Sequence, residues 1–326
     1  MRTDDARLHA PMIVADTRQR IAGRREYVVK HVRRHWFIYM LMLPGIVFMV
    51  VFRYVPMYGM LVAFKDLNMR IGILASPWVG LDNFAVLFQQ EYFYKVIANT
   101  VLINVYNIAV GFPFVILLAL ILNELQAGWY KRAVQTLVYI PHFVSWVVFA
   151  AIVAKMLDPE PTGAFNAFVG LFGVAPQHWL AVSEYFRFIL VVSGIIKTAG
   201  FATIIYLAAL SSVNPSLMES AICDGAHRGH LMWYIYLPRI SPTIAVLLIL
   251  NVANLFASNF DQVFNLYNPA VWDTGDVLST YLYRSGLLQG KFEMATALGL
   301  VFNVLGLIAV IVTNKLISRM NVMGIF

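Results

Sequence analysis

Six blocks of apolar residues, separated by polar stretches, divide the chain into predicted membrane spans. A helix of about 20 apolar residues crosses the roughly 30 Å hydrocarbon layer of a bilayer. The blocks lack the alternation of apolar and polar residues found in barrel strands, so helices are the expected spanning structure. The blocks cover residues 36–52 with an extension toward 62, 101–122, 134–156, 188–210, 244–260 and 295–312. The pattern therefore predicts an all-α integral membrane protein with six transmembrane helices.

Composition agrees with a membrane protein and excludes other classes. Hydrophobic residues make up 60% of the chain and charged residues 13%, whereas a soluble domain carries about 25% charged residues. The net charge of +7 lies in one tail and at helix ends, which favours a topology signal over a nucleic-acid partner. The single cysteine, Cys223, excludes an intramolecular disulfide and a cysteine-rich metal site. The first 35 residues are polar and basic, and we expect no secretory signal peptide there.

The distribution of lysine and arginine predicts the orientation. With the N-terminus inside, the inner segments hold 15 of the 24 basic residues and the outer segments hold 7. Basic residues are retained on the cytoplasmic side, so we expect both termini in the cytoplasm. We divide the chain into a basic N-terminal tail, a first helix with an aromatic-rich outer interfacial segment, a core with a cytoplasmic loop at 211–239, and a C-terminal tail. These four parts are residues 1–35, 36–94, 95–315 and 316–326.

The loop between the fourth and fifth blocks carries the most informative pattern. Asn214 followed by Pro215 predicts a helix start, with a capping side chain and then proline at the first helical position. Glu219 lies near that start, where a negative charge suits the helix dipole. Gly225 is a plausible turn, and a second short helix is expected to end near Pro238. By spacing alone, this unit is either a folded connector or a docking element for a cytoplasmic partner.

The same loop resembles the signature cytoplasmic loop of binding-protein-dependent ABC importer permeases. That pattern is Glu-Ala-Ala, then Asp-Gly-Ala, then Ile-x-Leu-Pro at a fixed distance, and this chain departs from it only in one small-for-small exchange at Ser220. The matching positions are Glu219, Ser220, Ala221, Asp224, Gly225, Ala226, Ile235, Leu237 and Pro238. Stretches within 54–84 and 260–284 resemble the polysaccharide-type permeases of that family.

The resemblance implies a type I ABC importer permease fold in a bacterial cytoplasmic (inner) membrane. It implies a second permease subunit, two ATPase subunits, an extracytoplasmic solute-binding protein and an oligosaccharide substrate. ATP and Mg²⁺ would bind the partner ATPase, and this chain would bind no cofactor and catalyse no reaction. The matched loop would contact the ATPase, with Gly225 setting its turn and Pro238 ending its second helix. ATP-driven closure would then move the permeases between inward- and outward-facing states.

Polar residues within the apolar blocks are candidates for a substrate pathway, because they are costly in lipid. The alternative for the amides is hydrogen bonding between helices. Lys197 has two open interpretations: contact with an anionic substrate, such as an alginate-like uronate oligomer, or pairing with a carboxylate of the partner permease. The pathway candidates are Lys197, Asn251, Asn254, Asn259, Asp261 and Gln262.

The sequence lacks the motifs of several other classes of protein. The chain contains no Gly-x-x-x-x-Gly-Lys-Ser/Thr, no His-Glu-x-x-His and no Gly-x-Ser-x-Gly, which argues against a nucleotide-binding loop, a zinc protease site or a nucleophile elbow. The alternative function is a secondary carrier or channel without an ATPase. Such carriers are often built from inverted repeats, and the sequence has none that we detect.

Overall fold

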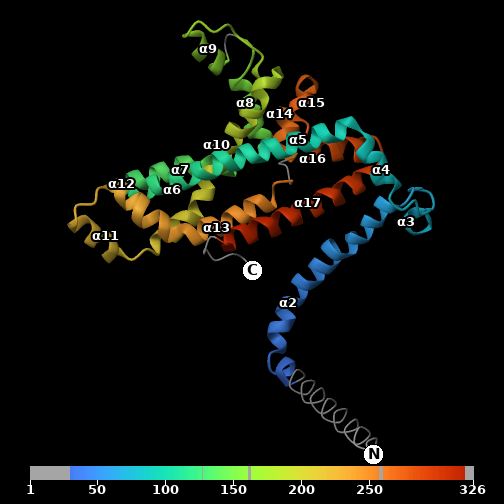
Figure 1. Cartoon of the computed structure of the whole chain (residues 1–326), viewed down its shortest axis with the longest axis horizontal. Helices are drawn as coiled ribbons and strands as arrows, with labels where there is room; N and C mark the ends of the chain where they lie inside the picture. The colour runs from blue at the N-terminus through green and yellow to red at the C-terminus, as the bar shows by residue number, and fades with distance from the viewer. Residues whose placement is uncertain (1–29, 127, 161–162, 257–259, 320–326) are drawn as a thin grey trace, which may run out of the picture. The chain divides into compact units, whose positions relative to one another are not determined.

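The computed structural model describes residues 30–126, 128–160, 163–256 and 260–319 (Figure 1). Within those ranges the regular structure is helical, apart from one isolated β-bridge between Lys65 and Trp78. The chain divides into two units, residues 1–61 and 62–326. The first unit contains α2 (Trp36–Met49) and η1 (Val50–Tyr54), and η2 (Val55–Phe64) carries the helix across the unit boundary.

Five helical runs in the described residues are long and apolar enough to cross a membrane. A sixth span is formed if two consecutive helices, α7 and α8, are counted together, although the chain bends by 103° between them. The prediction of six transmembrane helices is confirmed in this sense. The five continuous runs are Trp36–Phe64, Glu91–Glu124, Ser183–Ser211, Arg228–Ala253 and Phe292–Ile317.

The second unit begins with short outer helices and then the spans. Its second span starts at Glu91, ten residues before the apolar block, so the predicted boundary between 94 and 95 falls inside a helix. A short amphipathic helix at Asp82–Gln89 matches the expected interfacial segment. The elements up to the third span are α3 (Gly72–Ala75), α4 (Asp82–Gln89), α5 (Glu91–Tyr106), η3 (Asn107–Gly111), α6 (Phe112–Glu124), α7 (Trp129–Phe143) and α8 (Trp146–Met156).

The longest helix of the second unit is α10, with 29 residues. It packs against α6, α7 and α13, and α13 in turn packs along α17. The remaining elements are α9 (Ala164–Gly170), η4 (Trp179–Ala181), α10 (Ser183–Ser211), α11 (Pro215–Cys223), α12 (Arg228–His230), η5 (Leu231–Tyr236), α13 (Leu237–Ala253), α14 (Phe260–Leu266), η6 (Pro269–Val271), α15 (Trp272–Gly275), α16 (Leu278–Leu282), η7 (Tyr283–Leu288) and α17 (Phe292–Arg319).

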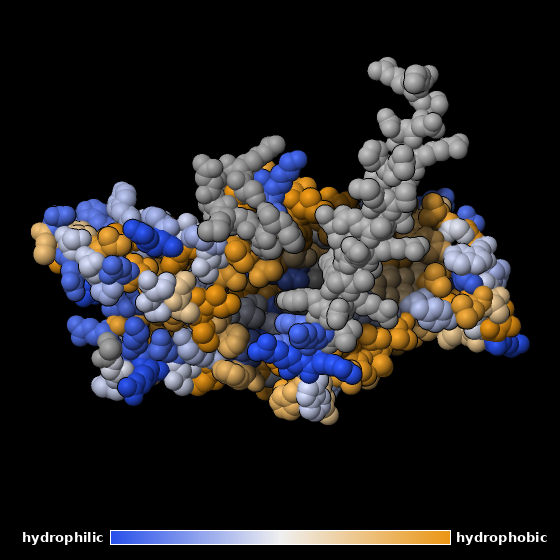
Figure 2. All heavy atoms as spheres, turned by 90° about the horizontal axis from the view of Figure 1, so that it is seen from below, coloured by the Kyte–Doolittle hydropathy of each residue, from blue (hydrophilic) through white to orange (hydrophobic). Residues whose placement is uncertain are grey.

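The helices of the second unit place the loop at 211–239 and α4 at opposite ends (Figure 1). Helices α11 and α12 lie at one end of the bundle, and α4 lies at the other (Figure 1). α8, which follows the bend after α7, packs against α14. Hydrophobic side chains cover much of the face seen in Figure 2, as expected of a surface in contact with lipid.

The close contact between α10 and α7 depends on Gly200. A Cβ atom at this position would overlap the carbonyl oxygen of Val138 on α7. Backbone cannot move aside as a flexible side chain can, so even one methyl group would push the helices apart. Gly299 on α17 is the opposite case, because a Cβ there would meet no atom within 4 Å.

Gly200→Ala is therefore expected to destabilise the chain by about 2 kcal/mol, the cost of overpacking a tight contact. The thermal unfolding midpoint of the detergent-purified protein should fall. Gly299→Ala is the matched control and should leave the midpoint unchanged or raise it slightly, because alanine favours helix by up to about 1 kcal/mol over glycine. Equal midpoints for the two variants would contradict the proposed contact.

Candidate functional site

A cavity of about 550 Å³ opens between the second span, α10 and α13. Its wall carries amide, hydroxyl and aromatic groups among aliphatic ones, and no charged side chain occurs among the lining residues that the structure describes. The polar lining residues are Asn104, Asn107, Thr198, Tyr206, Asn251 and Asn254. A cavity of this size with converging polar groups is the default site for a small polar ligand.

Three of these amides are oriented by their own helices. The Nδ2 atoms of Asn104, Asn251 and Asn254 donate to the carbonyl oxygens four residues earlier, at 2.9, 2.8 and 3.1 Å. The Thr198 hydroxyl does the same toward Gly194, at 2.8 Å. Because the amide nitrogen is turned back to the helix, the amide oxygen of the same planar group points away from it. The wall therefore offers acceptors, which suit the hydroxyl groups of a sugar.

The cavity brings together two of the six predicted pathway residues. Asn251 and Asn254 line it, as their spacing of three residues on one helix side allows. Sequence reasoning did not include Asn104 and Asn107 of the second span in the pathway. The signal was present, since this pair has the same three-residue spacing within an apolar block.

Three other candidates are not among the residues that line the cavity. Gln262 is buried, and its Nε2 donates to the Leu190 carbonyl at 2.6 Å and the Ser193 hydroxyl at 3.0 Å. Asp261 is exposed at the start of α14, and the ammonium of Lys197 is held by backbone carbonyls of the third span. Asn259 lies outside the described residues.

The loop at 211–239 folds as a helix, a turn and a second helical run. The Asn214 side chain accepts a hydrogen bond from the Ser216 N–H at 3.1 Å, which confirms the predicted cap. Gly225 has φ of +84°, a conformation that strains any residue with a Cβ. The Ala226 N–H then closes the turn on the Ala221 carbonyl at 2.9 Å.

The expectation that Pro238 ends the second helix is wrong. The helical run continues from Arg228 to Ala253, and Pro238 lies near the start of α13 within it. The preceding π-helical stretch, η5, carries wider turns than an α-helix. Proline has no N–H to donate, and the wide π-helical turns just before Pro238 are where this run departs from α-helical hydrogen bonding.

One side of α11 packs inward and the other is exposed. Met218 and Ala221 contact a buried cluster at the inner ends of α6, α10 and α13, where the Tyr236 hydroxyl lies 2.7 Å from the Met218 sulfur. Glu219, Ser220 and Asp224 are exposed. The loop is thus anchored to three spans while its charged face is accessible.

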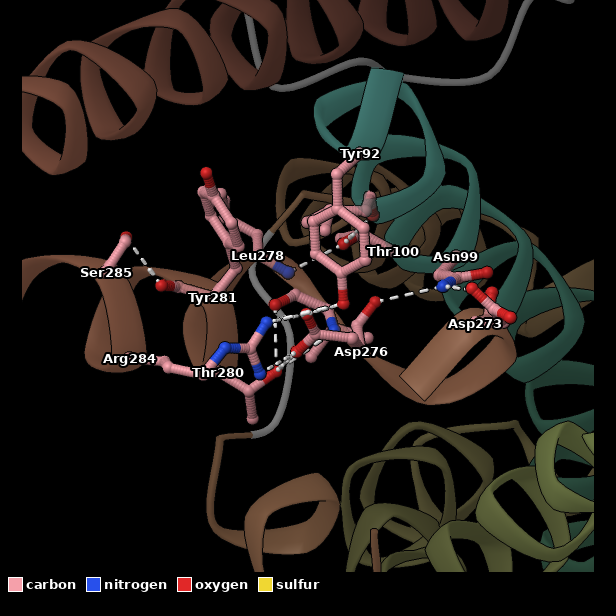
Figure 3. Close-up of polar contacts among 12 residues, drawn as sticks. Tyr92, Asn99, Thr100, Asp273, Asp276, Leu278, Thr280, Tyr281, Arg284 and Ser285 are labelled. Atoms are coloured by element: carbon pink, nitrogen blue, oxygen red, sulfur yellow. Dashed lines mark hydrogen bonds and ion pairs between the residues drawn. The ribbon is translucent and has the colours of Figure 1, made fainter. Parts of the chain in front are cut away.

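A buried polar network joins α5 to the segment from α15 to η7 (Figure 3). The Asp276 carboxylate is fully buried and accepts hydrogen bonds from the Tyr92 hydroxyl at 2.6 Å, the Thr280 hydroxyl at 2.7 Å and the Arg284 guanidinium at 2.5 Å. The Asn99 Nδ2 adds hydrogen bonds to the carbonyls of Asp273 and Asp276. The network therefore ties the start of the second span, at α5, to the segment that precedes the last span, α17.

Aromatic rings and charge hold Arg284 in this network. Its guanidinium lies 4.5 Å from the centroid of the Trp272 ring, a cation–π geometry. Burial by itself would lower the pKa of Arg284, but the hydrogen bond and the charge of Asp276 outweigh burial and raise that pKa. Arginine stays charged in any case, so its guanidinium is a constant positive charge beside the buried Asp276 side chain.

Comparison with known proteins identifies the family. Residues 111–322 match the family described as binding-protein-dependent transport system inner membrane component. The chain is 39% identical over 303 residues to the polygalacturonan/rhamnogalacturonan transport system permease protein YteP of Bacillus subtilis (strain 168), covering 93% of this chain and 94% of that protein. It is 36% identical to Protein LplB of the same organism, covering 94% and 96% of the two chains.

A solved structure agrees with these relatives. The fold resembles a chain from the crystal structure of a bacterial ABC transporter involved in the import of the acidic polysaccharide alginate, with a TM-score of 0.83 and 41% identity, covering 90% of this chain and 98% of that one. A second structure of a bacterial alginate ABC transporter, in complex with alginate pentasaccharide-bound periplasmic protein, gives a TM-score of 0.83 at 40% identity, covering 91% and 99%.

The chain belongs to the family of inner-membrane components of binding-protein-dependent transport systems. It is a permease subunit of an ABC importer, so the resemblance found in the sequence and the type I permease fold are confirmed. ATP hydrolysis belongs to a separate subunit. The alternative of a secondary carrier or channel finds no support among the relatives.

Arg284→Met tests the outer network, because it leaves the buried Asp276 carboxylate without its cation. We expect a loss of about 3 kcal/mol, the low end for a broken buried pair, since the arginine side chain keeps 17% exposure. The thermal midpoint of the purified protein measures it. Lys95→Met is the control: that lysine pairs with Asp273 at 3.4 Å on the surface, and such pairs contribute under about 1 kcal/mol.

The double variant Asp276→Asn with Arg284→Met should be more stable than Arg284→Met alone, because it removes the stranded charge. A midpoint for Arg284→Met as high as that for Lys95→Met would show that the network does not hold the outer end.

Proposed function

We propose that this chain forms part of the membrane path of an ATP-driven importer for acidic oligosaccharides. Two observations support the substrate class. The relatives at 39–41% identity are named for polygalacturonan/rhamnogalacturonan and for alginate, which are polymers with sugar acids. The cavity offers amide acceptors and aromatic rings to a polyhydroxylated ligand.

The amide cluster is the observation that carries the proposed path. Asparagine side chains from two different spans meet at one cavity, and Thr198 of α10 adds a hydroxyl. Three of the four amides donate to carbonyl oxygens of their own helix. Among the described residues, these three hydrogen bonds therefore do not join one helix to another. This argues against interhelical hydrogen bonding as their role.

In this proposal, other subunits recognise the negative charge of the substrate. The described cavity wall carries no cation, so hydroxyl groups and sugar rings, rather than carboxylates, would contact this chain. The binding protein and the second permease would select the acidic substrate. A neutral wall also avoids holding an anionic polymer so tightly that it cannot move on.

The cytoplasmic loop is the proposed contact with the ATPase. The exposed face of α11, with Glu219, Ser220 and Asp224, would bind the partner that holds ATP and Mg²⁺, and the anchored face would pass movement into α6, α10 and α13. This arrangement requires the loop, and with it both termini, on the cytoplasmic side of the inner membrane, as the basic residues favour.

The substrate proposal is tested by ATP hydrolysis in the reconstituted complex with its binding protein. Acidic oligosaccharides, such as oligouronates, should stimulate hydrolysis more than neutral oligosaccharides of equal length. Stimulation by the neutral sugars alone would exclude the acidic class.

Asn251→Leu and Asn254→Leu should lower transport of every saccharide that is accepted, because they remove hydroxyl acceptors, and should leave the preference for acidic over neutral ligands unchanged. Asn265→Leu is the matched control. Asn265 also donates to the carbonyl four residues earlier, at 2.6 Å, but is not among the cavity-lining residues. A change of charge preference in either cavity variant would contradict the assignment of charge selection to other subunits.

Gly225→Asp and Glu219→Lys test the coupling loop. We expect the complex to assemble and hydrolyse ATP while transport per ATP falls several-fold, because the turn and the charged face of α11 are altered. Uptake of labelled oligosaccharide and phosphate release, measured in the same proteoliposomes, give that ratio. Gly290→Asp is the control, since Gly290 has a similar φ of +71° in an outer segment. Wild-type ratios in both loop variants would rule out the proposed contact.

A further inference from the structure

The third span is interrupted inside the predicted membrane layer. α7 ends at Phe143, Val144 is extended, and α8 starts at Trp146 after a bend of 103°. A helix end leaves its last carbonyls without intrahelical donors. Hydrocarbon supplies no water to replace them, so donors have to come from the protein.

Lys197 of α10 supplies these donors. Its Nζ donates to the carbonyl oxygens of Pro141, His142 and Val144 at 3.2, 3.1 and 2.5 Å. A cation at a helix C-terminus is also favoured by the helix dipole. The side chain is only 5% exposed, and within the described residues these carbonyls are its hydrogen-bond partners.

The same ammonium contacts the other side of the break. It lies 5.1 Å from the ring centroid of Trp146 and 5.8 Å from that of Phe149, both on α8. At the end of α7, the His142 ring stacks on Phe201 of α10 with centroids 4.0 Å apart. One lysine therefore holds both helices that meet at the bend, and the stacked ring fixes the bend to α10.

The position of Lys197 on α10 separates it from the cavity. Gly194, Thr198 and Ala199 line the cavity, whereas Lys197 does not. The inner end of α10 leads within four residues to Pro215, the first residue of α11. A rigid helix of 29 residues, about 43 Å long, thus joins the loop, one cavity wall and the break.

We propose that Lys197 is a positioning residue that keeps the third span broken and makes the break move together with α10 during transport. It contacts neither substrate nor ATPase. The functional part of this inference rests on the proposed coupling through α11, and the structural part stands without it. An uncharged side chain at position 197 would leave these three part-buried carbonyls without the ammonium that now donates to them. A straighter α7–α8 segment would then become the favoured form.

The experiment measures the bend directly in the full complex in lipid nanodiscs. Spin labels are placed at Tyr130→Cys and Met156→Cys, two exposed positions near the ends of α7 and α8, in a Cys223→Ser background, since Cys223 is an exposed free thiol. A straight helix would separate these positions by about 39 Å. The 103° bend brings them to roughly 25 Å.

We expect the short distance in the parent protein and in Lys197→Arg, and a distribution extended toward the long distance in Lys197→Met. Lys155→Met is the matched control, because this lysine lies on α8 and is exposed. A narrow short distance in Lys197→Met overturns the proposal, as does an equal shift in Lys155→Met. If Lys197→Met does not assemble, Lys197→Gln decides: a broadened distribution supports the role of charge, and an unchanged one refutes it.

The functional readout is the ratio of transport to ATP hydrolysis, which a residue needed only for folding would not change in the assembled complex. Lys197→Met should lower the ratio several-fold, and Lys197→Arg should restore most of it. An unchanged ratio in Lys197→Met refutes movement through Lys197. Failure of all oligosaccharides to stimulate the parent complex would refute the proposed substrate and leave the distance result standing.

Discussion

A backbone that crosses hydrocarbon has to satisfy every N–H and C=O from within the protein, and the interruptions of the helices in this chain are arranged around that constraint. The sharpest interruption lies between α7 and α8, where three carbonyls receive their donors from Lys197. The Ser145 hydroxyl caps the start of α8 by accepting from the Val148 N–H at 3.3 Å. Both ends of the break thus have hydrogen-bond partners within the protein.

The π-helical stretches interrupt the α-helices less sharply and also keep their backbone groups hydrogen-bonded. Four π-helical stretches occur in the described residues, and each keeps backbone hydrogen bonds while widening the turn. One of them, η3, lies at the cavity and begins at Asn107. Its last residue, Gly111, lets the helix approach α10, because a Cβ there would lie 3.3 Å from Ile195. Of these four stretches, η3 is the one that contributes lining residues to the cavity.

The sequence was sufficient to predict features set by local chemistry. The six apolar blocks, the cap at Asn214 and the turn at Gly225 depend on residues close in the chain, and the structure agrees with them. The bend in the third span was missed although Pro141 and Ser145 lie within the block. Hydropathy measures how apolar a segment is and carries no information on its direction.

Contacts between distant residues explain the other differences. Lys197 meets carbonyls 53 to 56 residues away, and Gln262 meets Leu190 72 residues away. Neither partner is visible in a single sequence, so both polar side chains remained pathway candidates with a structural alternative left open. The matched loop motif gave the family but assigned the wrong role to Pro238, because its helix continues through a π-helical turn.

Helix α10 connects these features physically. It carries the Lys197 ammonium, the carbonyl and hydroxyl that bind Gln262, and Arg187, whose guanidinium donates to the Asn99 side chain at 2.7 Å and to the Thr274 carbonyl at 3.1 Å. A shift of α11 by a partner would therefore reach the cavity, the bend and the outer network through one rigid element. Because these contacts are hydrogen bonds to backbone and buried amides rather than flexible surface pairs, α10 cannot slide past them without breaking several at once. The helices bonded to α10 are thus expected to move together with it. The break between α7 and α8, held by Lys197, is where the direction of the third span changes.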